Sequence, residues 1–193
     1  KDMQKMLKKA KDAKNEAEIE YWDKRQLVKK INLNSLYGAI LNPGCRFFDK
    51  RIGQSTTLTG RTIVKHMSAE VNNCITGEYD HVGKAMIYGD TDSCYFSAWP
   101  MLKDDVESGK FEWTKEKCIT LMDQVCEQSN TTFPDFMYKA FHCPKSRSDV
   151  IAAGREIIAK RGLFITKKRY AALVIDNEGF RTDIDGKPGK VKA

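Results

Sequence analysis

Three features that many proteins carry are missing from this sequence. No apolar run approaches the ~18 residues that a membrane-spanning helix needs, which argues against an integral membrane protein. The chain begins Lys-Asp-Met, with neither a secretory signal peptide nor a transit segment, and a first residue other than Met suggests a piece of a longer protein. The six cysteines form no CxxC pair, which excludes a zinc ribbon. We therefore expect reduced thiols and a cytoplasmic location.

What is present fits one globular unit with a basic surface. The chain has 193 residues, of which 41% are hydrophobic and 31% charged, enough apolar material for a core. The net charge of +7 is uneven, because residues 1–30 carry 10 basic and 6 acidic residues and residues 155–193 carry 10 and 5. Charge gathered in two segments suits a polyanionic partner, although solvated lysines would give the same count.

The N-terminal segment has the spacing of a long helix. Apolar residues recur mostly at intervals of three and four over residues 1–40, with no proline and no glycine before Gly38. Such a helix would be about 50–60 Å long and would project from a small domain. Its apolar stripe has no evident partner, which predicts either self-association or fraying. The stripe consists of Met3, Met6, Leu7, Ala10, Ala17 and Tyr21.

The rest of the chain mixes helices with strands. Asn42-Pro43-Gly44 predicts a turn, residues 54–76 a helix, and residues 84–98 two strands about a tight turn. Residues 114–142 read as a helix that Pro134 interrupts, followed by β-rich segments at 149–158 and 163–176 and a hairpin turn at 176–179. Residues 185–193 are expected to be disordered. The order predicts an α+β fold, with an antiparallel sheet, packed helices and the projecting N-terminal helix.

Asp90 and Asp92 form the strongest chemical signal. They lie two apart in Tyr88-Gly89-Asp90-Thr91-Asp92-Ser93, and strand alternation predicts that both carboxylates point to one side. Paired carboxylates repel each other, and a hard cation such as Mg²⁺ relieves that repulsion. The alternative is an Asp-rich turn without a metal.

Two further clusters suit phosphate and bases. Lys30, Asn34 and Tyr37 are four and three residues apart, so they share one face of a helix, and Gly38 leaves room beside the aromatic ring. Tyr37 could instead be a core residue and Lys30 a solvated charge. The second cluster is Lys167-Lys168-Arg169-Tyr170, which places three consecutive cations in a predicted strand. These cations either bind a phosphate backbone or protect an exposed edge strand by their charge.

Glu156 is a further carboxylate in the β-rich part of the chain. It could approach the acidic hairpin or pair with its neighbour Arg155.

Together these motifs resemble the family B (alpha-type) DNA-directed DNA polymerases over about residues 20–186. Residues 30–38 match the family's KxxxNSxYG motif, residues 88–93 its YGDTDS motif at every position, and residues 167–170 its KKRY motif, in the family's order. Arg46-Phe47-Phe48-Asp49 looks closest to the phage replicative members. The resemblance divides the chain into a fingers helix segment (1–40), a palm segment (41–184) and the tail (185–193).

The resemblance implies a role for each cluster. Asp92, with Asp90 beside it, would be a catalytic ligand of two Mg²⁺ ions that act on the reacting phosphate. Lys30, Asn34 and Tyr37 would contact the incoming deoxynucleoside triphosphate and the nascent pair. Primer–template DNA would be held by Lys167, Lys168, Arg169 and Tyr170. Glu156 falls at a family carboxylate near the metals.

The family's DxxSLYP motif, which carries its first metal-binding aspartate, does not occur here, so this chain alone is expected to be inactive. No segment marks a contact for a sliding clamp, which the parent enzyme could use.

Two other functions compete with the polymerase. A haloacid-dehalogenase-type phosphatase also has two aspartates two residues apart, in a DxDx[TV] motif. Here Cys94 occupies the fifth position, where that motif has Thr or Val, and no βαβ alternation follows. A non-catalytic nucleic-acid-binding module fits the charge and is the stronger alternative.

Overall fold

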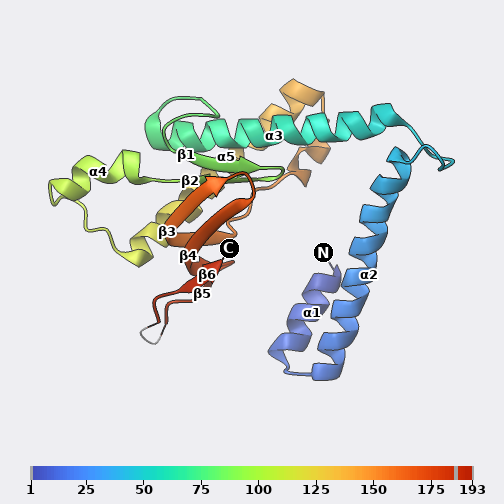
Figure 1. Cartoon of the computed structure of the whole chain (residues 1–193), viewed down its shortest axis with the longest axis horizontal. Helices are drawn as coiled ribbons and strands as arrows, with labels where there is room; N and C mark the ends of the chain where they lie inside the picture. Colours follow the sequence, from blue (N-terminus) through green and yellow to red (C-terminus); the bar gives the residue numbers. More distant parts are fainter. Residues whose placement is uncertain (1, 185–186, 193) are drawn as a thin grey trace. The chain divides into compact units, whose positions relative to one another are not determined.

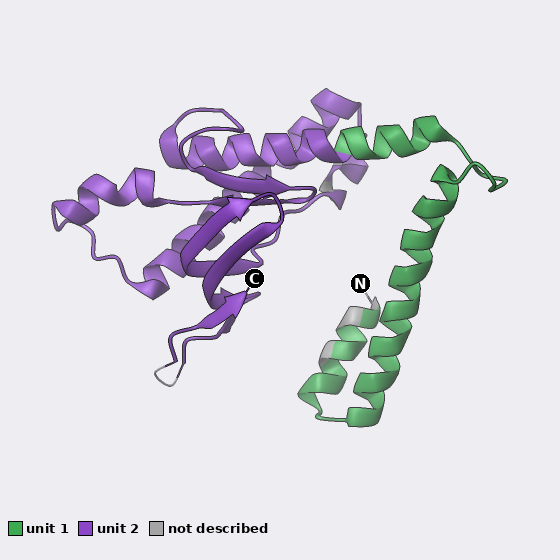
Figure 2. Ribbon diagram, in the orientation of Figure 1, with its two compact units in different colours: residues 1–59 green, residues 60–193 purple. Residues whose placement is uncertain are grey.

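The computed structural model describes residues 2–184 and 187–192 and mixes α-helices with antiparallel strands. The predicted α+β class is therefore confirmed. The chain divides into two compact units, Lys1–Thr59 and Gly60–Ala193, which Figure 2 distinguishes by colour. The fingers segment (1–40) and palm segment (41–184) that the resemblance implies are functional regions rather than compact units, and this division stays a prediction.

The first unit contains a helical hairpin where one long helix was predicted. Helix α1 (Asp2–Asp12) is followed by a turn that includes Lys14, whose φ of 51° is left-handed, and α2 (Glu16–Leu41) begins after Asn15. The Asn15 side chain accepts a hydrogen bond from the Glu18 N–H at 3.3 Å, which makes it the N-cap of the second helix. The prediction of one continuous helix over residues 1–40 was wrong, because the capping signal at Asn15 starts a second helix.

Helix α1 folds back along α2 (Figure 1). Ala10, a member of the predicted unpartnered stripe, is 1% exposed. Part of the stripe is therefore covered within the chain, whereas α2 itself buries no residue.

Helix α3 (Lys50–Thr76) carries the core of the second unit. The predicted helix over 54–76 is confirmed and starts four residues earlier. Val71 and Ile75 pack with Ala85 and Val125, so the helix contacts both the β1 region and α5. The chain leaves α3 through Gly77, whose φ of 78° suits a helix C-terminus.

Asn72 connects α3 to the strand that follows. Its side chain is fully buried, donates to the Glu78 carbonyl at 2.7 Å and accepts from the Ala85 N–H at 3.1 Å. Gly83 lies so close that a Cβ there would be 2.1 Å from the Asn72 amide nitrogen. The loop between α3 and β1 is thereby held at both ends.

The predicted hairpin over 84–98 is confirmed as β1 (Met86–Asp90) and β2 (Ser93–Phe96), paired antiparallel. Helix α4 (Trp99–Glu107) follows and then α5 (Lys115–Phe141).

The predicted break of α5 at Pro134 was wrong, because the helix continues through it. A helix-interior proline costs about 3 kcal/mol. Packing on both sides of it offsets this cost: Phe133 is 1% exposed, and Phe136 stacks on His66 with ring centroids 3.8 Å apart.

The C-terminal part is a second antiparallel sheet, after a 3₁₀ turn at Lys145–Val150. Strand β3 (Ile157–Thr166) pairs with β4 (Arg169–Asn177), which also pairs with β5 (Phe180–Arg181) and β6 (Lys190–Lys192). The hairpin turn predicted at 176–179 is confirmed, with positive φ at Glu178 and Gly179.

The β-rich segment predicted at 163–176 is confirmed as the end of β3 and most of β4, but the expected strand through Lys167-Lys168 was wrong, because the chain turns there. The β-rich segment predicted at 149–158 was wrong for residues 149–156, which precede the first strand of this sheet. The tail was expected to be disordered, but residues 190–192 pair with β4; the expectation for 185, 186 and 193 lies outside the described residues.

No described helix is long and apolar enough to span a membrane.

Candidate active site

The acidic hairpin is a two-residue turn, and its two carboxylates differ in environment. Asp90 ends β1 opposite Ser93 and is half-buried, whereas Asp92 lies in the turn and is exposed. The Asp92 N–H donates to the Asp90 carbonyl at 2.6 Å across Thr91, whose φ is 52°. The prediction that strand alternation aligns both side chains was wrong, since Asp92 is not in a strand.

The basic motif is also a turn. Thr166 and Arg169 pair across it, which leaves Lys167 and Lys168 as its two central residues, with a φ of 64° at Lys168. The expected alternation of Lys167 and Arg169 on one strand face was therefore wrong. Both lysines therefore lie at the end of the hairpin, where their side chains are exposed.

These two turns lie together. The Lys167 and Lys168 ammonium groups approach opposite carboxylate oxygens of Asp90, at 3.9 and 4.0 Å. Both lysine side chains are more than 70% exposed, so the ion pairs contribute little to stability. Their significance is positional, because residues 77 positions apart place an acidic and a basic turn side by side.

An aromatic cluster joins the two hairpins that carry these turns. Tyr88 and Tyr95 of the β1–β2 hairpin contact Phe164 and Tyr170 of the β3–β4 hairpin, with ring centroids 5.3–6.2 Å apart. The Tyr95 hydroxyl donates to the Tyr170 hydroxyl at 2.9 Å, and burial together with this bond raises the pKa of Tyr95. This cluster was not predicted from the sequence. The signal that could have indicated it is the pair of aromatic residues in or beside each motif, Tyr88 and Tyr95 for the acidic turn and Phe164 and Tyr170 for the basic turn.

No hydrogen bond or ion pair among the described residues joins Glu156 to Asp90 or Asp92, although its charge acts on Tyr95 of β2 and helps to raise the pKa of that hydroxyl. Its carboxylate accepts from the Lys192 ammonium group at 2.8 Å. The alternative pairing with Arg155 was wrong, since that guanidinium contacts Asp123 of α5 and Asp176 of β4.

The KxxxNSxYG cluster lies in the first unit. Lys30 and Asn34 are exposed on α2, and the half-buried Tyr37 donates to the Gly53 carbonyl at 3.4 Å. No atom lies within 4 Å of the position that a Cβ would take at Gly38. This surface and the acidic hairpin belong to different units, so their roles at one site stay predictions.

The donor chemistry of the hairpin suits a hard cation but supplies only part of a site. Mg²⁺ is typically held by one or two carboxylates, with phosphate oxygens and water completing its shell. Asp90 and Asp92 provide two carboxylates, and across residues 2–184 and 187–192 no group of three His, Cys, Asp or Glu side chains could hold a metal ion. The residues therefore fit Mg²⁺ as partial ligands.

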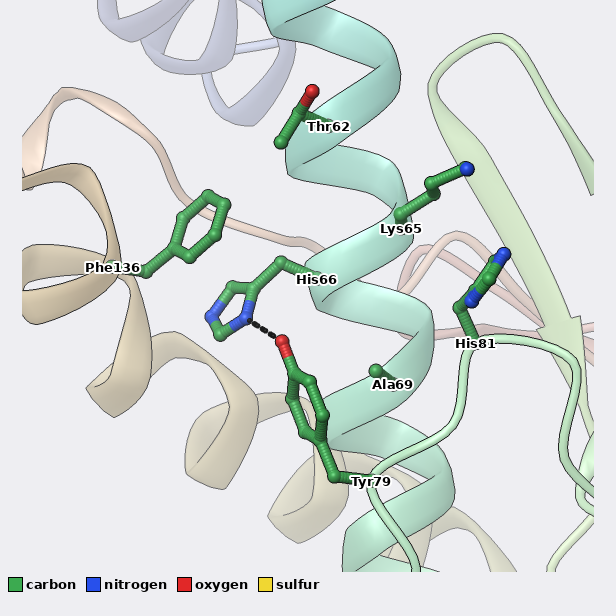
Figure 3. A pocket seen from close by; sticks show the side chains of 7 residues that line it. All are labelled: Thr62, Lys65, His66, Ala69, Tyr79, His81 and Phe136. Atoms are coloured by element: carbon green, nitrogen blue, oxygen red, sulfur yellow. Dashed lines mark hydrogen bonds between the residues drawn. The ribbon is translucent and has the colours of Figure 1, made fainter. Parts of the chain in front are cut away.

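A separate pocket lies between α3, α5 and the loop before β1 (Figure 3). His66 forms one wall, where Nδ1 bonds the Tyr79 hydroxyl at 2.8 Å and Nε2 the Thr132 hydroxyl at 3.0 Å. Both ring nitrogens bond to neutral hydroxyl groups, and the ring packs against Phe133 and Phe136. We therefore interpret His66 as a structural residue. Burial lowers the pKa of His66, and the charge of Glu70 opposes this shift only in part.

Acidification should therefore destabilise the second unit through His66. Since its folded pKa lies below the unfolded value near 6.5, the unfolded state binds the proton first and stability falls as the pH drops below about 6.5. Urea unfolding between pH 5 and 8 measures this fall, which His66→Gln should reduce. The exposed His81, next to Asp80, is the matched control, and an equal effect of His81→Gln would contradict the assignment.

The family model for DNA polymerase family B matches residues 1–106, more than half of the chain. The chain belongs to this family.

The relatives include proteins of two phages and of Arabidopsis thaliana. A DNA-directed DNA polymerase of Escherichia phage RB69 is 30% identical over 166 residues, which cover 81% of this chain and 18% of that enzyme. The DNA polymerase alpha catalytic subunit of Arabidopsis thaliana is 30% identical over 177 residues, 91% of this chain and 9% of that protein. The enzyme of Enterobacteria phage T4 is 28% identical over 171 residues, 81% of this chain and 18% of that enzyme.

The chain thus spans less than a fifth of the length of these relatives. No solved structure matches it significantly.

Proposed function

We propose that this chain is the part of a DNA-directed DNA polymerase that holds the reacting primer end during DNA replication. One observation carries the proposal: the half-buried Asp90 carboxylate lies between the ammonium groups of Lys167 and Lys168. This arrangement brings a metal-binding type of side chain next to a phosphate-binding type. Membership in the polymerase family supports the same reading.

Each cluster has a role in the proposed reaction. Asp92 and Asp90 hold Mg²⁺, which when bound stabilises charge on the attacking and leaving oxygens. Lys167, Lys168, Arg169 and Tyr170 bind the primer–template backbone and hold the primer 3′ end in place. Lys30 and Asn34 contact the triphosphate, and Tyr37 lies against the nascent base pair. Glu156, paired with Lys192, is outside this scheme.

The chain alone is proposed to be inactive, because its carboxylates make only part of the metal site and the DxxSLYP motif is absent. The test is Mg²⁺-dependent primer extension by the full-length protein. A nucleic-acid-binding module, the alternative function, would bind the duplex without extending it. Cytoplasmic location and a sliding-clamp partner of the parent enzyme belong to the same proposal.

Self-association through the N-terminal helices is proposed on a different observation. Tyr21, Leu27 and Ile31 of α2 are 51–54% exposed, which leaves apolar surface available to a second copy. Sedimentation over a range of concentrations tests this, and a strict monomer at all concentrations contradicts it.

Lys168→Ala should weaken the binding of primer–template duplex by this chain and lower its salt dependence. Loss of one phosphate contact reduces the slope of log affinity against log salt by about one. Fluorescence anisotropy with a labelled duplex measures both quantities. Lys103→Ala, an equal charge change on α4, is the control, and an equal loss there would mean that net charge alone governs binding.

A further inference from the structure

Each of the two turns of the candidate active site contains one residue in a strained backbone conformation. Thr91 in the acidic turn and Lys168 in the basic turn both have left-handed φ values, 52° and 64°, which residues with a side chain rarely adopt. Such conformations persist only where surrounding contacts hold them. The contacts that hold Lys168 therefore determine where the lysines of the turn point.

Tyr88 supplies the contact that holds this backbone. Its hydroxyl accepts a hydrogen bond from the Lys168 N–H at 2.8 Å, across 80 positions of sequence. Its ring contacts Phe164 and Tyr170, the residues on either side of the basic turn, with centroids 5.8 and 6.2 Å away. The hydroxyl thus has a defined position relative to the turn.

Tyr88 and Asp90 act on the basic turn from the same face of β1. Exposure alternates along this strand, which places Tyr88 and Asp90 on its half-buried face, with Ile87 and Gly89 on the other. One face therefore provides both the hydrogen bond to the Lys168 backbone and the carboxylate that meets the two ammonium groups. The backbone bond does not depend on charge, so it would persist when a DNA phosphate replaces Asp90 as the partner of the lysines.

We propose that Tyr88 is a positioning residue that sets the basic turn for the primer strand through its hydrogen bond to the Lys168 amide. The inference rests on the proposed function, because it takes DNA phosphate as the ligand of Lys167 and Lys168. It assigns a role to the first residue of the YGDTDS motif that is distinct from metal binding.

The test compares Tyr88→Phe with Tyr95→Phe in this chain. Both variants remove one hydroxyl from the same aromatic cluster, but only the first removes the acceptor of the Lys168 N–H. Hydrogen exchange followed by NMR reports on the Lys168 amide, and anisotropy with a labelled primer–template duplex gives affinity and salt slope. Thermal unfolding identifies a variant that is damaged overall.

Tyr88→Phe should speed exchange of the Lys168 amide and weaken duplex binding, each by about threefold to tenfold, the range for one hydrogen bond. Its salt slope should fall by up to about one, as for a lost phosphate contact. Tyr95→Phe should leave all three quantities near wild type.

Unchanged exchange in Tyr88→Phe, or faster exchange with unchanged duplex binding, would overturn the inference and leave the proposed function intact. Equal losses in the two variants would also overturn it, since the cluster would then act only through general stability. If the wild-type chain fails to bind duplex, the failure lies with the proposed function, and the inference falls with it.

Discussion

Asp92→Ala in the full-length enzyme should lower nucleotide addition by about a thousandfold or more. A ligand of a catalytic metal contributes several kcal/mol to the transition state, and each 1.36 kcal/mol is a factor of ten in rate. Asp92 is exposed at the tip of the acidic turn, so its loss leaves no cavity. The variant should therefore fold normally.

DNA affinity should change little in the same variant, because the phosphate-binding lysines remain in place. Single-turnover primer extension measures the rate, and duplex titration measures the affinity. Asp104→Ala removes an exposed carboxylate from α4 and is the matched control for charge. Near-normal turnover of Asp92→Ala would exclude the polymerase mechanism for this site.

Local signals in the sequence predict the acidic hairpin correctly. Gly89, the two aspartates and the flanking apolar residues specify a tight turn between short strands, which is the structure observed. The α3 helix and the 176–179 turn were predictable for the same reason, since each depends on spacing and turn residues within a few positions. The identity of the candidate site follows from such local motifs.

What the sequence did not predict depends on contacts between distant segments. Lys168 takes a left-handed turn conformation that lysine disfavours, and the hydrogen bond from its amide to Tyr88 comes from 80 residues away. Helix α5 likewise continues through Pro134 because His66 of α3 packs against Phe133 and Phe136, which lie on either side of the proline. Local propensity could not indicate either outcome, because tertiary contacts decide both.

Arg155 is a further residue whose importance the sequence concealed. It looked like a partner for its neighbour Glu156, yet its guanidinium contacts Asp123 on α5 and Asp176 on β4. Asp176 is 2% exposed and also accepts from the Gly179 N–H at 3.0 Å. Burial disfavours the charged guanidinium, but the hydrogen bonds to the two carboxylates outweigh it and raise the pKa of Arg155.

Arg155→Met should lower the free energy of unfolding by about 3–5 kcal/mol, because it leaves the Asp176 carboxylate buried without a counter-charge. Urea unfolding at pH 7 measures the loss. Asp123→Asn is the matched control: it weakens the guanidinium's other ion pair, whose carboxylate is 46% exposed, and should cost no more than about 1 kcal/mol.

The double variant Arg155→Met/Asp176→Asn should recover much of the stability lost in Arg155→Met. It removes the buried charge, and the Asn amide oxygen can still accept from the Gly179 N–H. Equal losses in Arg155→Met and Asp123→Asn would contradict a buried pair with Asp176. Without recovery in the double variant, the loss would come from packing of the Arg155 stem, and the connection between α5 and the sheet that carries the basic turn would be apolar.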